Sequence, residues 1–231
     1  MDIFYNRIIA SVFPDRCCFC GKTIRHKTKL CKDCRKTAEV IKSDACTLCG
    51  MPKKRCRCRK RTHFYAGITA PFIYEGVVRH GISLWKFGSL YRSVYFFAEM
   101  IAASVSKAFP QENFDIITFI PQTEKESAKR GYNQGEILAT EVGKRLNIPV
   151  MPLLVKIYDT ERQHSLPYLS RSGNIFGAFD ICNRDLVSNK KILLIDDIKT
   201  SGATLNECAK MLRLYEAQSV HCAVIAVADK H

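Results

Sequence analysis

The sequence predicts an α/β protein with a mostly parallel sheet flanked by helices, preceded by a small N-terminal metal-binding domain. Two observations carry this prediction. Segments typical of strands and of helices alternate from residue 67 onward, which is the pattern of proteins built on parallel sheets. Nine of the twelve cysteines lie between residues 17 and 58. We therefore expect two domains, at 1–66 and 67–231.

Apolar patterning assigns an element to each part of the chain in turn. The segment 1–13 predicts a short amphipathic helix, because Ile3, Phe4, Ile8 and Val12 fall on one side of it. The expected strands are 67–74, 114–120, 150–155, 192–195 and 219–227, and the expected helices are 77–87, 91–109, 135–146 and a segment beginning near Thr204.

Residues that interrupt regular structure support these boundaries. Gly88 follows the expected helix 77–87, and Pro110 follows the expected helix 91–109. Glycine is common just after a helix, and proline cannot continue one. Pro121 ends the strand 114–120 in the same way.

Composition and charge exclude several classes of protein. The 231 residues are 47% hydrophobic and 25% charged, as in soluble globular proteins. The longest apolar stretch, 94–103, is short and contains Glu99, so we expect no membrane span. The N-terminus lacks the features of a signal peptide, and we expect a cytoplasmic protein. Of the formal charge of +14, residues 1–63 supply +12, from 17 Lys and Arg against 5 Asp and Glu.

Four close pairs of cysteines predict two structural zinc sites. Each pair brings two thiolates to one face of a tight turn, and two such turns complete a tetrahedral site. Sequential pairing is the simplest arrangement, but interleaved pairing stays open, and Cys18 or His63 could replace a ligand. A disulfide framework is the alternative, and it requires an oxidising compartment. The candidate ligands are Cys17, Cys20, Cys31 and Cys34 for one site and Cys46, Cys49, Cys56 and Cys58 for the other.

A dense cationic run at 53–61 predicts an interface for single-stranded nucleic acid. The second zinc site would hold these cations on a rigid turn, and Phe64 and Tyr65 follow closely. Cations neutralise the phosphate backbone, and aromatic rings stack on bases. The alternative is a solvated face that balances the charge of the zinc thiolates. The candidate contacts are Lys53, Lys54, Arg55, Arg57, Arg59, Lys60 and Arg61.

The segment 192–205 places two acids beside a phosphate cradle. Asp196 and Asp197 come where the apolar strand is expected to end, and a helix follows. A helix N-terminus beyond the carboxyl ends of parallel strands binds anions, and two adjacent carboxylates suit the hydroxyls of a ribose. The implied ligand is a ribose 5-phosphate, with a paired-acid magnesium site as the alternative. The expected phosphate contacts are Thr200, Ser201, Gly202, Ala203 and Thr204.

Other segments are candidates for the remainder of this site. Pro121 and Gln122 follow the strand 114–120 and would lie in the same crevice, where they are candidates to contact pyrophosphate. Arg130 could neutralise phosphate oxygens in a bidentate manner. The polar segment 162–179 is long enough to close over a ligand, and it contains His164, a weaker acid–base candidate.

The segment 192–205 resembles the 5-phosphoribosyl 1-pyrophosphate (PRPP) binding motif of type I phosphoribosyltransferases, with Ser201 where that family usually has Thr. Over nearly its whole length the chain resembles the ComF family of competence-associated proteins. The clearest departure is 120–123, where relatives commonly have Val-Pro-Val-Pro. Besides the paired cysteines and the PRPP-like segment, the resemblance rests on Tyr74-Glu75-Gly76, Lys86-Phe87, Arg130-Gly131-Tyr132-Asn133-Gln134, Gln163-x2-Leu166, Arg171-x2-Asn174 and Gly177-Ala178-Phe179.

This resemblance implies a type I phosphoribosyltransferase-like fold that binds PRPP with Mg²⁺. It also implies a role in handling transforming DNA, with DNA-uptake or recombination proteins as partners. Transfer from PRPP would involve Asp196, Asp197 and Arg130, with an unassigned acceptor. One alternative is a non-catalytic accessory protein that binds single-stranded DNA on a transferase fold. A dedicated base-salvage enzyme is a further alternative.

Overall fold

A computed structural model describes residues 15–42, 44–58, 63–88, 90–122, 133–157 and 178–229. The helix expected at 1–13, Arg130 and most of the segment 162–179 lie outside the described residues.

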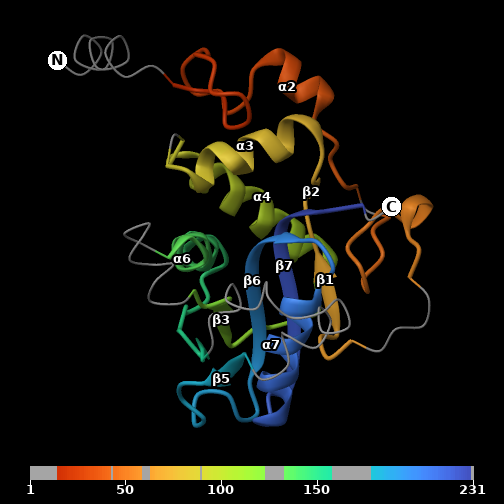
Figure 1. Cartoon of the computed structure of the whole chain (residues 1–231), viewed down its shortest axis with the longest axis vertical. Coiled ribbons are helices and arrows are strands. Elements are labelled where there is room, and N and C mark those ends of the chain that lie inside the picture. The colour runs from red at the N-terminus through yellow and green to blue at the C-terminus, as the bar shows by residue number, and fades with distance from the viewer. Residues whose placement is uncertain are drawn as a thin grey trace, which may run out of the picture.

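The core of the molecule is a parallel sheet with the strand order β1-β7-β6-β3 (Figure 1). Its two central strands, β6 (Lys191–Lys199) and β7 (Ser219–Val227), pair along their whole length, from Lys191 opposite Ser219 to Lys199 opposite Val227. Strand β3 (Ile116–Phe119) extends the sheet on the β6 side, and β1 (Gly67–Thr69) extends it on the β7 side.

The strand expected at 67–74 is present but interrupted. Its second part, β2 (Phe72–Ile73), pairs with β7 in the register that β1 begins. The gap falls at Ala70 and Pro71. Proline has no N–H group to donate to a neighbouring strand, which explains the interruption.

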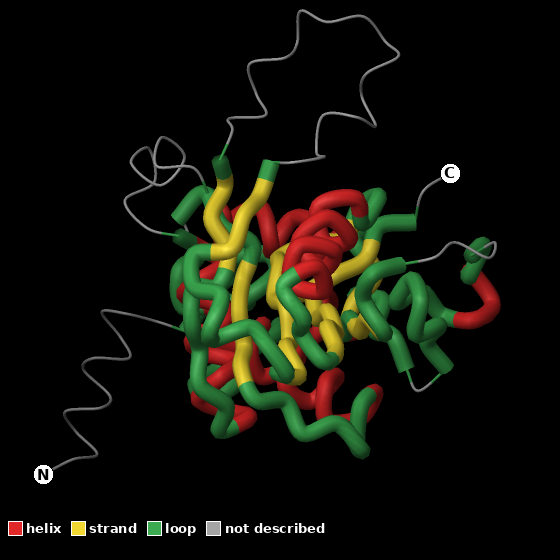
Figure 2. Tube along the Cα trace, turned by 90° about the horizontal axis from the view of Figure 1, so that it is seen from below, coloured by secondary structure: helices red, strands yellow, loops and turns green. Residues whose placement is uncertain are grey.

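The sheet separates two layers of packing. Alternate side chains of β6 point to opposite faces: Leu193 and Ile195 pack toward α3 (Gly76–Lys86), α4 (Ser93–Ala108) and α6 (Gln134–Leu146). Ile192 and Leu194 pack toward α7 (Ala203–Leu214). Helices therefore lie on both sides of the strands (Figures 1 and 2). The four helices begin within two residues of the expected positions, and α3, α4 and α6 also end within one residue of the expected ends.

The strand expected at 150–155 is wrong in its extent. Val150 makes one isolated bridge to Ile117, and the chain then forms β4 (Leu154–Lys156). Strand β4 pairs in antiparallel fashion with β5 (Phe179–Ile181), a strand that sequence patterning did not indicate. The two form a small separate sheet that packs with α7 on one face of the main sheet.

The cysteine-rich segment packs against the sheet and its helices. It contains α2 (Lys32–Thr37) and the short helix η1 (Lys53–Arg55). Phe19, between two cysteines of the first cluster, is fully buried against Phe72, Phe96 and Phe97. The domain boundary expected at residue 66 stays a prediction, but the two parts share hydrophobic clusters. Within the described residues, no helix has the length and apolar character needed to cross a membrane.

Candidate functional site

Strand β6 carries both predicted acids into the sheet rather than ending before them. Asp196 pairs with Val224 of β7, and the ladder continues to Lys199 opposite Val227. The expected strand 192–195 was too short because carboxylates at a strand end look like the start of a loop. Backbone pairing with β7 keeps the segment extended, so both acids sit on a rigid support.

Asp196 lies in an environment that disfavours its charge. Its carboxylate accepts a hydrogen bond from the backbone N–H of Asp197 at 2.8 Å. Burial, together with the neighbouring Asp197 carboxylate, raises the pKa of Asp196 well above its usual range. A raised pKa in a carboxyl group beside an anion-binding turn is typical of functional sites.

Asp197 forms an ion pair that sequence analysis did not identify. Its Oδ2 lies 2.6 Å from the Nζ of Lys86, at the end of α3. The side chains of Lys86 and Asp197 are 26% and 23% exposed, so a ligand can reach them. Gln134, the first residue of α6, is buried and donates from its amide to the backbone oxygen of Lys86 at 2.5 Å. The only earlier signal was the resemblance, which included Lys86 and Gln134 without giving them a role.

The turn after β6 has the geometry of an anion cradle. Gly202 adopts a left-handed conformation, with φ of 78°, immediately before α7 begins at Ala203. The Ser201 hydroxyl accepts a hydrogen bond from the N–H of Ala203 at 3.3 Å. This bond places the hydroxyl at the first turn of α7, where an anion would bind. Thr200 is exposed, and Thr204 is partly exposed. The predicted phosphate contacts therefore form one continuous turn at a helix N-terminus, where N–H groups are available.

The predicted pyrophosphate turn lies beside the same strand. The backbone N–H of Ile120 donates to the oxygen of Ile195, which holds the turn next to Asp196. Pro121 and Gln122 follow, both partly buried. Among the described residues, Gln122 Oε1 is a buried oxygen with no hydrogen-bond partner. A buried acceptor without a partner is costly and suits a bound donor or cation.

The eight predicted zinc ligands form two clusters. Within each cluster the sulfur atoms lie within 4.8 Å of one another, and the pairing is the sequential one: Cys17, Cys20, Cys31 and Cys34, then Cys46, Cys49, Cys56 and Cys58. Zinc–sulfur bonds of about 2.3 Å place tetrahedral thiolates roughly 3.8 Å apart. The Sγ–Sγ distances of 3.8 Å for Cys20–Cys31 and 3.6 Å for Cys49–Cys56 fit this geometry.

The two residues considered as replacement zinc ligands make other contacts in the structure. Cys18 is buried in the hydrophobic core, where burial raises the pKa of its thiol to about 11. His63 stacks on Tyr65 with ring centroids 4.6 Å apart. Neither belongs to a described cysteine cluster.

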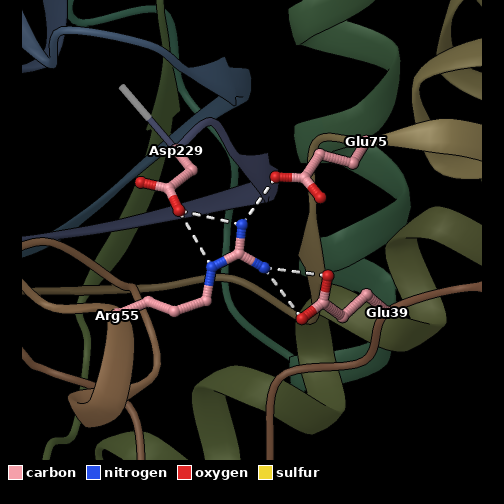
Figure 3. A network of polar contacts seen from close by, with 4 residues as sticks. All are labelled: Glu39, Arg55, Glu75 and Asp229. Carbon is pink, nitrogen blue, oxygen red and sulfur yellow. Dashed lines mark hydrogen bonds and ion pairs between the residues drawn. The ribbon is translucent and has the colours of Figure 1, made fainter. Parts of the chain in front are cut away.

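The predicted nucleic-acid residues are not equivalent. Lys53, Lys54 and Arg57 are exposed. Arg55 instead has its guanidinium among three carboxylates (Figure 3): Glu39 at 2.8 Å, Glu75 at 2.6 Å and Asp229 at 2.8 Å. Arg59, Lys60 and Arg61 lie outside the described residues.

The partners of Arg55 connect the second cysteine cluster to the edge of the sheet that bears the acids. Asp229 follows β7, whose end is tied to β6 because the N–H of Ala228 donates to the oxygen of Lys199. Glu75 precedes α3, the helix that ends at Lys86. Figure 1 shows the cluster beside the C-terminal end of β7. Arg55 therefore fastens the cluster next to the anion cradle.

Replacing Arg55 with Ala should lower the free energy of unfolding by about 2 kcal/mol. The change leaves Asp229, whose side chain is only 11% exposed, without its partner and close to two other acids. The partial exposure of Glu39 and Glu75 keeps the loss moderate. Urea denaturation measures the effect, with Arg57→Ala as a control that should stay within about 0.5 kcal/mol of the wild type. Equal losses in both variants would contradict the structural role of Arg55.

Comparisons with known proteins agree with this architecture. Residues 8–66 match the double zinc ribbon domain, and residues 132–231 match the phosphoribosyl transferase domain. Competence protein ComFC of Bacillus subtilis (strain 168) is 26% identical over 194 residues, which cover 80% of this chain and 78% of that protein. Competence protein ComFC of Streptococcus pneumoniae (strain ATCC BAA-255 / R6) is 27% identical over 232 residues, covering 89% and 96%.

Solved structures also align with the chain. A glutamine PRPP amidotransferase from B. subtilis, complexed with ADP and GMP, aligns with a TM-score of 0.41 and 20% identity over 57% of this chain and 25% of that chain. The domain matches confirm the predicted fold class, a phosphoribosyltransferase-like α/β domain with an N-terminal zinc ribbon.

Proposed function

Given that the chain belongs to the ComF family, with its double zinc ribbon and phosphoribosyltransferase domain, we propose that it binds PRPP together with Mg²⁺ at the end of β6. The observation that carries the proposal is the juxtaposition of Asp196 and Asp197 with the glycine turn that opens α7. No other described segment places two carboxylates on a strand directly before a helix N-terminus.

Each part of the ligand has a candidate partner. The 5-phosphate would accept hydrogen bonds from the turn Thr200–Thr204, and the ribose hydroxyls would donate to Asp196 and Asp197. Lys86 would remain beside Asp197 and offer its charge to the pyrophosphate. Mg²⁺ prefers oxygen ligands, which the two acids and Gln122 Oε1 supply, and when bound it would neutralise charge on the leaving pyrophosphate.

Calorimetric titration with PRPP and Mg²⁺ tests this site. Replacing both Asp196 and Asp197 with Asn should weaken binding by about a hundredfold or more, because each lost charge-assisted hydrogen bond contributes about 1.5 to 3 kcal/mol. Asp185→Asn changes an exposed acid outside the site and should leave affinity unchanged. Equal affinity in the double variant and the wild type, with both proteins folded, would refute the assignment of the acids.

The raised pKa of Asp196 gives the same titration a second readout. If ribose hydroxyls or Mg²⁺ require the ionised carboxylate, the raised pKa of Asp196 predicts that binding releases a proton. The observed enthalpy should then depend on the ionisation enthalpy of the buffer. That dependence should diminish in Asp196→Asn. A buffer-independent enthalpy in the wild type would show that Asp196 does not ionise on binding.

Catalysis would follow from the same arrangement. Departure of pyrophosphate builds positive charge at the anomeric carbon, which the carboxylates of Asp196 and Asp197 would stabilise. Pentosyl transfer from PRPP to an acceptor, with Arg130 assisting the leaving group, therefore belongs to the proposal. Release of pyrophosphate in the presence of candidate bases tests turnover, and product with a free purine or pyrimidine would favour base salvage.

A second function, binding of single-stranded DNA during uptake, is favoured by the position of the exposed cations. The segment beside the second cysteine cluster connects it to α7: the N–H of Phe64 donates to the Asn206 side chain in the first turn of α7 at 2.8 Å, and the Tyr65 hydroxyl donates to the oxygen of Leu48, between Cys46 and Cys49, at 3.1 Å. Lys53, Lys54 and Arg57 are exposed on this cluster. DNA binding through them should weaken with rising salt. A role with DNA-uptake or recombination proteins and a cytoplasmic location complete the proposal.

A further inference from the structure

Three large aromatic side chains are exposed between the end of α3 and the first turn of α4. Phe87 is 78% exposed, Tyr91 is 43% exposed and Tyr95 is 44% exposed. They recur at intervals of four residues. Most large apolar side chains nearby are buried, including Trp85, Val94 and Phe97. We call Phe87, Tyr91 and Tyr95 the aromatic row.

Helical geometry aligns the second and third members of the aromatic row. The backbone N–H of Val94 donates to the oxygen of Tyr91, and that of Tyr95 donates to Arg92, so the chain already turns helically at Tyr91. Residues four apart in a helix lie on one face, one turn from each other. The opposite face of α4 packs on the core through Val94 and Phe97.

The aromatic row begins at the proposed PRPP site. Phe87 directly follows Lys86, whose Nζ lies 2.6 Å from Asp197. This end of the aromatic row is therefore next in the chain to the residue that pairs with an acid of β6.

Cations border the other end of the aromatic row. The guanidinium of Arg145 donates to the backbone oxygen of Tyr95 at 3.1 Å and to Glu141 at 2.9 Å. Lys144 also pairs with Glu141 at 2.7 Å. One carboxylate therefore faces two cations, and the group of Glu141, Lys144 and Arg145 has a net positive charge. Arg92, between the two tyrosines in sequence, is exposed.

We propose that the aromatic row is a base-stacking surface for single-stranded nucleic acid that leads to the end of β6. Exposed rings at regular spacing with cations alongside fit a strand whose bases stack while its phosphates meet Arg92, Lys144 and Arg145. This surface is separate from the cations of the cysteine clusters. It goes beyond the proposed PRPP site, and each proposal can fail without the other.

Binding of a fluorescein-labelled oligothymidylate, followed by anisotropy, tests the aromatic row in the full chain loaded with zinc. Replacing Tyr91 and Tyr95 together with Ala should weaken binding by at least about tenfold, since each stacked base contributes about 1 to 3 kcal/mol. Replacing both with Phe should restore most of the affinity, because the rings remain. Leu214→Ala, at a remote exposed apolar residue, should have no effect.

The dependence on salt separates stacking from charge. The slope of affinity against salt should stay unchanged in the Ala double variant, whereas replacing Arg92, Lys144 and Arg145 with Gln should reduce it. Photo-cross-linking with iodouracil-substituted DNA should modify Tyr91 or Tyr95.

Three outcomes would overturn the proposal. They are unchanged affinity in the Ala double variant, cross-links confined to the cysteine clusters, or a change of oligomeric state on sedimentation that marks the aromatic row as a contact between copies of this chain. Calorimetry with PRPP on the same variants distinguishes this failure from failure of the PRPP site, because Tyr91→Ala/Tyr95→Ala should bind PRPP normally.

Discussion

Removing zinc is expected to unfold most of the protein, beyond the cysteine-rich segment alone. A structural zinc site contributes about 10 to 16 kcal/mol in zinc-finger peptides, whereas the net stability of a domain is about 5 to 15 kcal/mol. The loss of one ion is therefore comparable to the whole stability. Phe19 and Cys49 belong to the two hydrophobic clusters that enclose the sheet, so the disturbance reaches both faces. Circular dichroism during titration with a zinc chelator measures it.

Cysteine variants make the zinc experiment specific to each cluster. Cys20→Ser and Cys58→Ser remove one ligand from the first and the second cluster, and each should reduce the bound zinc from two ions to one per chain. Each should also lower the melting temperature by tens of degrees, on the order expected for loss of a structural ion. Cys182→Ser, at an exposed cysteine outside both clusters, should keep both ions. Full zinc content in the ligand variants would contradict the assignment.

The order of elements was predictable because burial leaves a periodic trace in the sequence. The nearly continuous apolar run of β7 and the amphipathic faces of α3, α6 and α7 all appear at the expected positions. The errors occur where long-range pairing decides the conformation. Strand β6 continues through Asp196 and Asp197 because β7 pairs with it there, and no local pattern reveals that partner. Strand β5 was missed because it is three residues long and pairs only with β4.

In the candidate site, too, the predictable residues are those that lie close together in the sequence. The two acids and the glycine turn are contiguous, so a local motif contains them. The sequential zinc pairing was the simplest of several arrangements, and the structure selects it by distance. The Lys86–Asp197 pair and the Arg55–Asp229 pair join residues 111 and 174 positions apart, and no local rule connects them. Residue type predicted a phosphate contact for Arg55, whereas its partners in the structure are three carboxylates.

Replacing Gly81 with Ala is expected to destabilise the protein by about 2 kcal/mol or more, although alanine favours helices over glycine by about 1 kcal/mol. A Cβ atom at this position in α3 would lie 2.6 Å from Phe19 Cα and 2.7 Å from Cys18 O. These are backbone atoms of the first cysteine cluster, held by zinc ligands on both sides, so they cannot move aside cheaply. Helix α3 must therefore shift away from the cluster. Urea denaturation of zinc-loaded protein measures the loss.

Gly135→Ala is the matched control, because a Cβ atom there, in the first turn of α6, would meet its nearest neighbours at 3.3 Å. We expect its effect on stability to be small in either direction.

Gly81→Ala has a second consequence, since α3 ends at Lys86, whose Nζ lies 2.6 Å from Asp197. A shift of α3 would displace that charge and should weaken PRPP binding by threefold or more, on the order of 0.7 kcal/mol, in protein that is still folded. Unchanged PRPP affinity in a destabilised Gly81→Ala variant would mean that Lys86 is positioned by β6 and Gln134 alone. Weakened affinity would make the zinc ribbon a positioning element for the phosphoribosyl site, because the backbone of the ribbon lies directly against α3 at Gly81.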